Sequence, residues 1–141
     1  MLKWSDDLSV GVPEIDRQHQ QVARRANLLL EKLPGGSPGL VCDAFDFFET
    51  FISDHFRTEE QYMISTPAHA YRGAEAHTLA HHSFLSAYRA FRAEINKGAT
   101  DELFVRQFSL WIMEWYQEHI QTHDKELGVF LKARSKKPRR K

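Results

Sequence analysis

Three turn-forming stretches divide the chain into four long segments, and this division limits the possible folds more than any other feature. The stretches are PGGSPG (34–39), STPAH (65–69) and NKGATD (96–101), whose residues are typical of connections. Each segment between them runs roughly 20 to 30 residues without an internal proline, and its apolar residues recur every three or four positions, as on one face of a helix. The sequence therefore predicts an all-α, up-and-down antiparallel four-helix bundle with an N-terminal arm.

Charge is distributed unevenly along the 141 residues, a length that suits one domain. The last ten positions, KARSKKPRRK, hold seven of the 19 basic residues and no acid, whereas residues 1–131 have 12 basic and 19 acidic residues, a net charge of −7. We expect the bundle to span residues 1–131 and the basic tail, 132–141, to be disordered and solvated. The alternative is a tail that weakly contacts an anionic surface or an acidic partner.

Composition indicates the cellular compartment in which we expect the protein to act. Hydrophobic residues make up 42% of the sequence, yet no apolar run approaches the ~20 residues of a transmembrane segment. The N-terminus, MLKWSDDLSV, lacks the basic start and apolar stretch of a signal peptide. Cys42, the single cysteine, cannot form an internal disulfide. We expect a cytoplasmic monomer with no specific nucleic-acid partner.

Histidines occupy the apolar faces of all four predicted helices. One such histidine is usually a hydrogen-bonded core residue, but five together indicate a set of metal ligands. These positions are His19, His55, His77, His81 and His119. Glu59 shares the face of its helix with His55, four residues earlier. A buried carboxylate needs a proton or a cation to neutralise it, and a metal ion supplies the cation.

The number of candidate ligands predicts more than one ion. With Glu59 and Asp124, five histidines exceed what one six-coordinate metal can use, whereas two metals bridged by two carboxylates can use them all. Imidazole suits iron, zinc, copper or nickel, and carboxylates favour iron or manganese. His119 and Asp124 are five residues apart, about 140° around an ideal helix. In a regular helix His123, four residues after His119, shares its face better than Asp124 does. A ligand role for Asp124 therefore requires a long reach or a π-type bulge.

Four motifs carry a family resemblance over roughly residues 4–130. They are GVPEIDRQH (11–19), HFRTEEQYM (55–63), HTLAHHSF (77–84) and WYQEHIQTHD (115–124). Their order and spacing resemble those of the bacterial hemerythrins.

The resemblance implies two non-haem irons that bind dioxygen reversibly. One iron would be held by His77, His81 and His119 and the other by His19 and His55. Glu59 and Asp124 would bridge them together with an oxo or hydroxo group, and dioxygen would occupy an open position on the two-histidine iron. The implied role is an oxygen carrier, store or sensor, with an oxygen-consuming protein as a possible partner.

Five side chains near these ligands are expected to line the ligand pocket: Val22, Phe56, Trp115, Tyr116 and Ile120. Tyr116 stands where relatives commonly have leucine. Its hydroxyl can reach a backbone carbonyl or solvent, or it can donate a hydrogen bond to bound ligand. Asp16 and Glu60 are candidates to orient the imidazoles, although exposed roles are expected for both.

Two other functions use the same residues. A di-iron redox enzyme, such as a peroxidase, a nitric-oxide-handling protein or a ferroxidase-like protein, would need the same ligands. A structural zinc site is less favoured, since closed zinc sites usually have four ligands and often cysteine. The excess of neutral imidazole over carboxylate favours binding without turnover, because carboxylates stabilise higher iron oxidation states.

Overall fold

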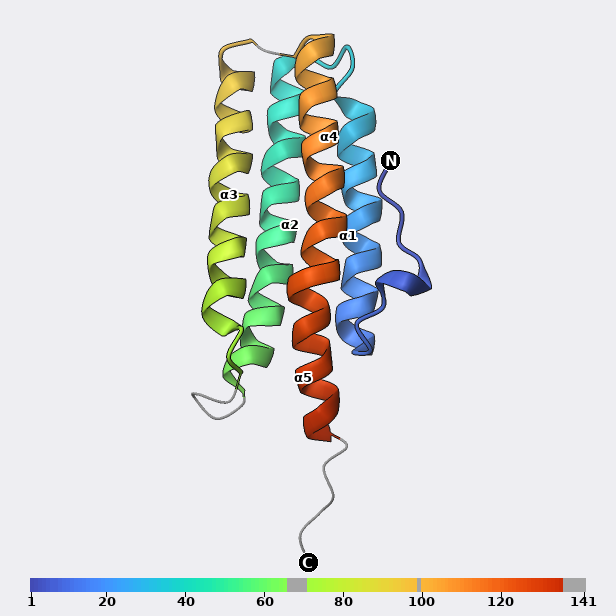
Figure 1. Cartoon of the computed structure of the whole chain (residues 1–141). Coiled ribbons are helices and arrows are strands. Elements are labelled where there is room, and N and C mark those ends of the chain that lie inside the picture. The colour runs from blue at the N-terminus through green and yellow to red at the C-terminus, as the bar shows by residue number, and fades with distance from the viewer. Residues whose placement is uncertain (66–70, 99, 136–141) are drawn as a thin grey trace, which may run out of the picture.

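The chain folds into four long helical rods that run alternately up and down (Figure 1), as predicted. The structure, a computed structural model, describes residues 1–65, 71–98 and 100–135, and every regular element in these ranges is helical. The elements are η1 (Asp6–Leu8), α1 (Pro13–Lys32), α2 (Pro38–Ile64), α3 (Ala74–Asn96), α4 (Glu102–His119), η2 (Ile120–Asp124) and α5 (Lys125–Ser135). α4, η2 and α5 continue one another and form the fourth rod.

Local sequence explains where the helices begin and end. α1 and α2 each start at a proline, which suits the first turn because its missing N–H has no helical partner there. The Ser37 side chain accepts a hydrogen bond from the Leu40 amide, and Asp101 caps α4 in the same way. Gly98 takes a φ of 91° just after α3, in the left-handed region that ends many helices.

The predicted apolar faces form the core, and Phe91 in α3 and two tryptophans in α4 are only half-buried there. The apolar residues that recur every three or four positions along α1 and α2, such as Ile15, Val22, Phe45 and Ile52, are buried. In α4, Ile112 and Tyr116 are buried, whereas Trp111 and Trp115 are half-buried. Ile112 and Tyr116 follow Phe104 at steps of four residues, which places them inside. The large indoles of the two tryptophans cover the edge of the same helix face.

The N-terminal arm is fixed along the bundle. Asn27 accepts a hydrogen bond from the Leu2 amide (2.8 Å) and donates one to the Leu2 carbonyl oxygen (2.9 Å). Asp16 accepts one from the Val10 amide (2.8 Å). A Cβ on Gly128 would overlap the Val10 carbonyl oxygen, so glycine allows the arm to lie directly on α5.

The C-terminal rod extends beyond the predicted end of the bundle. α5 runs to Ser135, so the first four residues of the predicted tail are helical. The other six, 136–141, and most of the STPAH connection lie outside the described residues. No helix in the described ranges is long and apolar enough to cross a membrane.

Candidate metal centre

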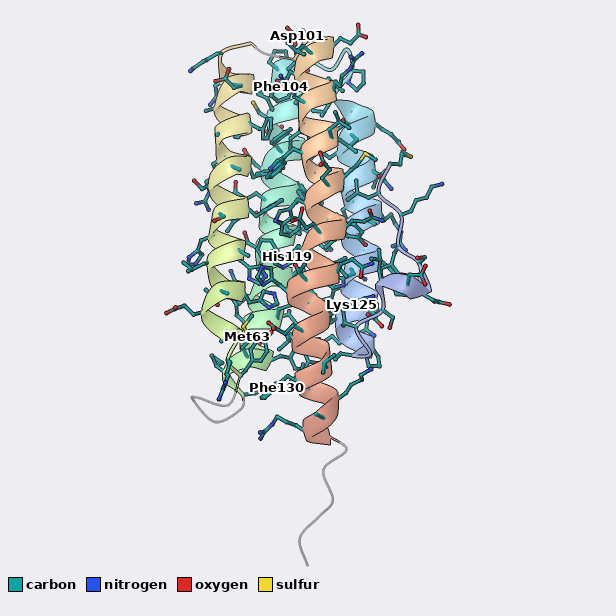
Figure 2. All side chains as sticks on the ribbon, viewed as in Figure 1. Met63, Asp101, Phe104, His119, Lys125 and Phe130 are labelled. Atoms are coloured by element: carbon teal, nitrogen blue, oxygen red, sulfur yellow. The ribbon has the colours of Figure 1, made fainter. Side chains whose placement is uncertain are left out.

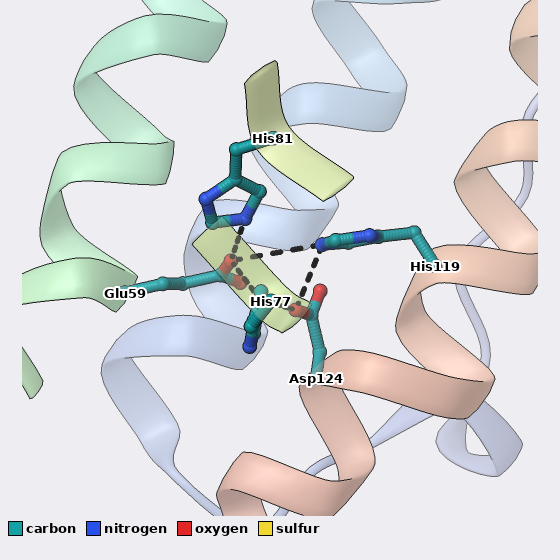
Figure 3. Close-up of side chains that lie close together, drawn as sticks. All are labelled: Glu59, His77, His81, His119 and Asp124. Atoms are coloured by element: carbon teal, nitrogen blue, oxygen red, sulfur yellow. Dashed lines mark hydrogen bonds and ion pairs between the residues drawn. The ribbon is translucent and has the colours of Figure 1, made fainter. Parts of the chain in front are cut away.

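Side chains from all four rods meet inside the bundle. Figure 2 shows His119 midway along it, and Figure 3 shows the five cluster residues that come from α2, α3 and the fourth rod. All seven predicted ligands lie there, and each is at most 5% exposed. They are His19 on α1, His55 and Glu59 on α2, His77 and His81 on α3, and His119 and Asp124 on the fourth rod.

Three imidazoles share one oxygen from each carboxylate (Figure 3). Glu59 Oε1 lies 3.2 Å from His77 Nε2, 3.0 Å from His81 Nε2 and 4.0 Å from His119 Nε2. Asp124 Oδ1 lies 2.8 Å from His77 Nε2 and 3.1 Å from His119 Nε2. These five side chains form a group in which each offers one ligand atom.

The second oxygen of each carboxylate faces the other two imidazoles. Glu59 Oε2 lies 3.0 Å from both His19 Nε2 and His55 Nε2. Asp124 Oδ2 lies 2.9 Å from His19 Nε2. Glu59 and Asp124 therefore belong to both groups, with one oxygen directed to each.

The spacing of these atoms fits ligands around a cation. Seven of the eight nitrogen–oxygen contacts measure 2.8 to 3.2 Å, and neighbouring ligands about 2.1 Å from an octahedral metal lie about 3.0 Å apart. His119 Nε2 and both Asp124 oxygens are buried and, among the described residues, have no hydrogen-bond partner despite their close approach. Atoms so placed but not aligned for hydrogen bonds suit a shared cation between them.

The electrostatics also indicate a site that needs positive charge. Burial alone lowers the pKa of His19, but the facing carboxylates of Asp124 and Glu59 outweigh it and raise this pKa to about 10. The pKa of His77 is raised in the same way, to about 9. Burial raises the pKa of Glu59, but the neighbouring histidines, His55 first, hold it well below its usual value. Without a metal, protons on imidazoles neutralise the two acids.

A π-helical turn brings Asp124 to the centre. η2 covers Ile120–Asp124, and hydrogen bonds between residues five apart widen the helix there. Asp124 thereby approaches His119 on the same side of the rod, which resolves the five-residue spacing. His123 lies beside the cluster, with its ring centroid 5.2 Å from that of His119.

Two polar side chains contact the far nitrogens of the imidazoles. His55 Nδ1 lies 2.7 Å from Gln18 Oε1, and His81 Nδ1 lies 2.8 Å from Glu60 Oε2. An imidazole that donates through Nδ1 presents the Nε2 lone pair to the centre. Glu60 thus makes the contact that was considered for it, whereas Asp16 holds the arm. Gln18 was missed, because its partner His55 lies on another helix.

A small cavity of about 10 Å³ adjoins the two-histidine group, with room for about one water-sized molecule. Its lining comprises His19, Val22, Ile52, His55, Trp115, Tyr116, His119, Ile120 and Asp124. Four of the five predicted pocket residues are in this set. Phe56 is not, because it stacks on His81 with ring centroids 3.9 Å apart. Ile52 lines the cavity although it was not among the predicted pocket residues.

The Tyr116 hydroxyl has a partner within the protein. It donates a hydrogen bond to the His19 carbonyl oxygen at 2.7 Å. Burial and the Asp124 carboxylate raise the pKa of Tyr116 above its ordinary value, so the hydroxyl keeps its proton. Of the two roles considered, the backbone contact is the one present.

Comparisons with known proteins agree with this geometry. The chain is 25% identical over 130 residues to a bacteriohemerythrin of Clostridium acetobutylicum, covering 89% of this chain and 98% of the relative. A bacteriohemerythrin of Stenotrophomonas maltophilia is 26% identical over 135 residues, covering 94% and 83%. A family model described as the hemerythrin HHE cation binding domain matches residues 10–131. On this match, the chain belongs to the hemerythrin family.

Proposed function

We propose that the protein binds two iron ions in this cluster and reversibly binds dioxygen beside them. The observation that carries the proposal is the division of the carboxylate oxygens. One oxygen of Glu59 and one of Asp124 face three imidazoles, and the other two oxygens face two. A carboxylate used in this way bridges two cations, and facing helices of a bundle commonly build such sites. His77, His81 and His119 would hold one iron and His19 and His55 the other.

The two-histidine group is where a small ligand fits. It has one imidazole fewer, and the cavity touches His19 and His55. When bound, the iron pair would supply electrons to dioxygen and recover them on release. The protein's part is to keep this position accessible to a small molecule.

The cavity walls favour release of dioxygen over further reaction. Val22, Ile52 and Ile120 are at most 3% exposed and present only hydrocarbon, so they exclude water from the ligand. Tyr116 directs its proton to the His19 carbonyl oxygen. Five neutral imidazoles against two carboxylates add little negative charge, which otherwise favours higher oxidation states.

The relatives support the same reading, because the similar proteins are named bacteriohemerythrins. Carriage, storage or sensing of oxygen in the cytoplasm, with delivery to an oxygen-consuming protein, completes the proposal.

Absorption spectra of the iron-loaded protein test it. The protein is reduced with dithionite, exposed to air and then purged of oxygen, over several cycles. A charge-transfer band that appears in air and disappears on purging is the expected result. Iron analysis should give two irons per chain.

The informative contrary result is a band that persists after purging. Irreversible oxidation in the first exposure would identify a redox enzyme instead, and consumption of added peroxide or nitric oxide would then be measured. Binding of a single ion, or of zinc in preference to iron, would contradict the di-iron site itself.

A further inference from the structure

A groove of about 660 Å³ lies on the surface between the C-terminal half of α1 and the N-terminal half of α2. Three large apolar side chains at this groove are exposed to solvent: Leu28 (48%), Leu40 (69%) and Phe47 (61%). Isolated exposed apolar residues are ordinary, but three gathered around one groove indicate a surface that another molecule covers.

The two edges of the groove carry opposite charge. Lys32 stands on the α1 edge and Asp43 on the α2 edge, while Arg25 extends from α1 toward α2. The Arg25 guanidinium lies 5.2 Å from the Phe47 ring centroid and 5.0 Å from that of Phe51. These cation–π contacts hold the positive charge along the groove, next to its apolar floor.

We propose that the groove is covered by a second copy of this chain in a twofold symmetric dimer. An isologous interface needs a surface that is complementary to itself. A twofold axis along the groove places the α1 edge of each copy on the α2 edge of the other. Lys32 of one copy then faces Asp43 of the second, twice by symmetry, while Phe47 and Leu40 enter the facing groove.

The mixed charge distinguishes this occupant from a lipid surface. An anionic membrane attracts an edge of uniform positive charge, and Asp43 opposes such contact. The proposed dimer differs from the monomer expected from the sequence. It involves no residue of the metal centre, so its failure leaves the proposed function unaffected.

Sedimentation velocity of the full-length protein, over a range of micromolar concentrations, tests the dimer. The wild type should sediment as a dimer, and Phe47→Glu should weaken self-association about tenfold or more by placing a charge in the apolar contact. Leu79→Glu on α3, where the side chain is 57% exposed and outside this groove, is the matched control and should leave the dimer unchanged. Circular dichroism verifies folding of each variant.

Charge reversal tests the pairing of the edges. Lys32→Glu and Asp43→Lys should each weaken the dimer, because each brings like charges together. The double variant should recover it, since the edges are again opposite. A monomeric wild type, or a dimer insensitive to Phe47→Glu, would overturn the proposal. So would a monomer that cosediments with anionic vesicles, which would identify the groove as a lipid contact.

Discussion

The imidazoles of the centre differ in the side chains that contact their Nδ1 atoms. His81 contacts a carboxylate, Glu60, whereas His55 contacts the neutral amide of Gln18. A charged acceptor makes an imidazole a stronger donor to metal than a neutral one does. The three-histidine group therefore has both more nitrogen ligands and the more basic one.

Asp124 and His123 provide a direct test of the ligand assignment. Asp124→Ala should reduce iron content from two per chain and abolish the di-iron absorption, because it removes one oxygen from each group. His123→Ala should keep both irons. Metal analysis of the purified variants measures the difference, and loss of iron from the His123 variant instead would reverse the assignment.

Tyr116 is predicted to matter for stability more than for ligand chemistry. Tyr116→Phe removes only the hydroxyl that donates to the His19 carbonyl oxygen. We expect the free energy of unfolding to fall by about 1 kcal/mol and the rate of oxidation in air to stay unchanged. Urea denaturation and the decay of the oxygenated spectrum give the two values. Faster or slower oxidation with unchanged stability would mean that the hydroxyl contacts the ligand.

Helical periodicity was sufficient to predict that the five histidines and Glu59 meet in the core, but it favoured His123 over Asp124 and did not place the partners of the imidazoles. Buried histidines at helical spacing leave few alternatives, since each must lie in the core. Gln18 on α1 contacts His55 on α2, and the period of a single helix does not predict a contact between two helices. Phe56, expected to line the ligand pocket, stacks on His81 and does not line the cavity, and periodicity could not predict this because it gives the face of a helix and not the rotamer.

At the level of elements, the fourth rod is the least regular part of the bundle. α4 and α5 are joined through the π-helical η2, whose hydrogen bonds are less favourable than those of an α-helix. Such a turn accommodates one extra residue while the helices on either side keep their faces. The sequence indicated this turn only through the distance from His119 to Asp124.

Deletion of single residues tests the role of η2. Removing Thr122, which is exposed, should convert the π turn to α-helix and leave His119 and Asp124 on one face, four apart. We expect this variant to bind two irons. Removing Ser109, within α4, is the control and should rotate all later residues by about 100° and abolish binding. Loss of iron from the Thr122 deletion would show that the wide turn itself positions Asp124.

For the whole molecule, the stability of the metal-free protein should depend on pH through its buried histidines and acids. The raised pKa values of His19 and His77 give stabilisation that is complete below about 6.5 and lost as pH rises through about 9 to 10. The lowered pKa values of Glu59 and Asp124 give stabilisation that is present above about 4.5 and lost in acid. Stability should therefore be highest in between, near pH 5 to 6.

Urea denaturation of metal-free protein at about pH 5.5, 7.5 and 9.5 measures this dependence. The free energy of unfolding should decrease toward alkaline pH in the metal-free form. It should decrease much less with iron bound, since the cation then neutralises the acids. A flat profile for the metal-free protein would mean that its buried acids are balanced in another way.

The two ligand groups differ in their number of histidines, so we expect two metal ions to bind in a fixed order. A first equivalent of divalent ion is expected to enter the three-histidine group and use one oxygen of each acid. The second must then join carboxylates that already carry a cation, so it binds more weakly and leaves first. A preparation short of iron would thus consist largely of half-filled molecules, intact in fold but without the iron pair that the proposed oxygen binding requires.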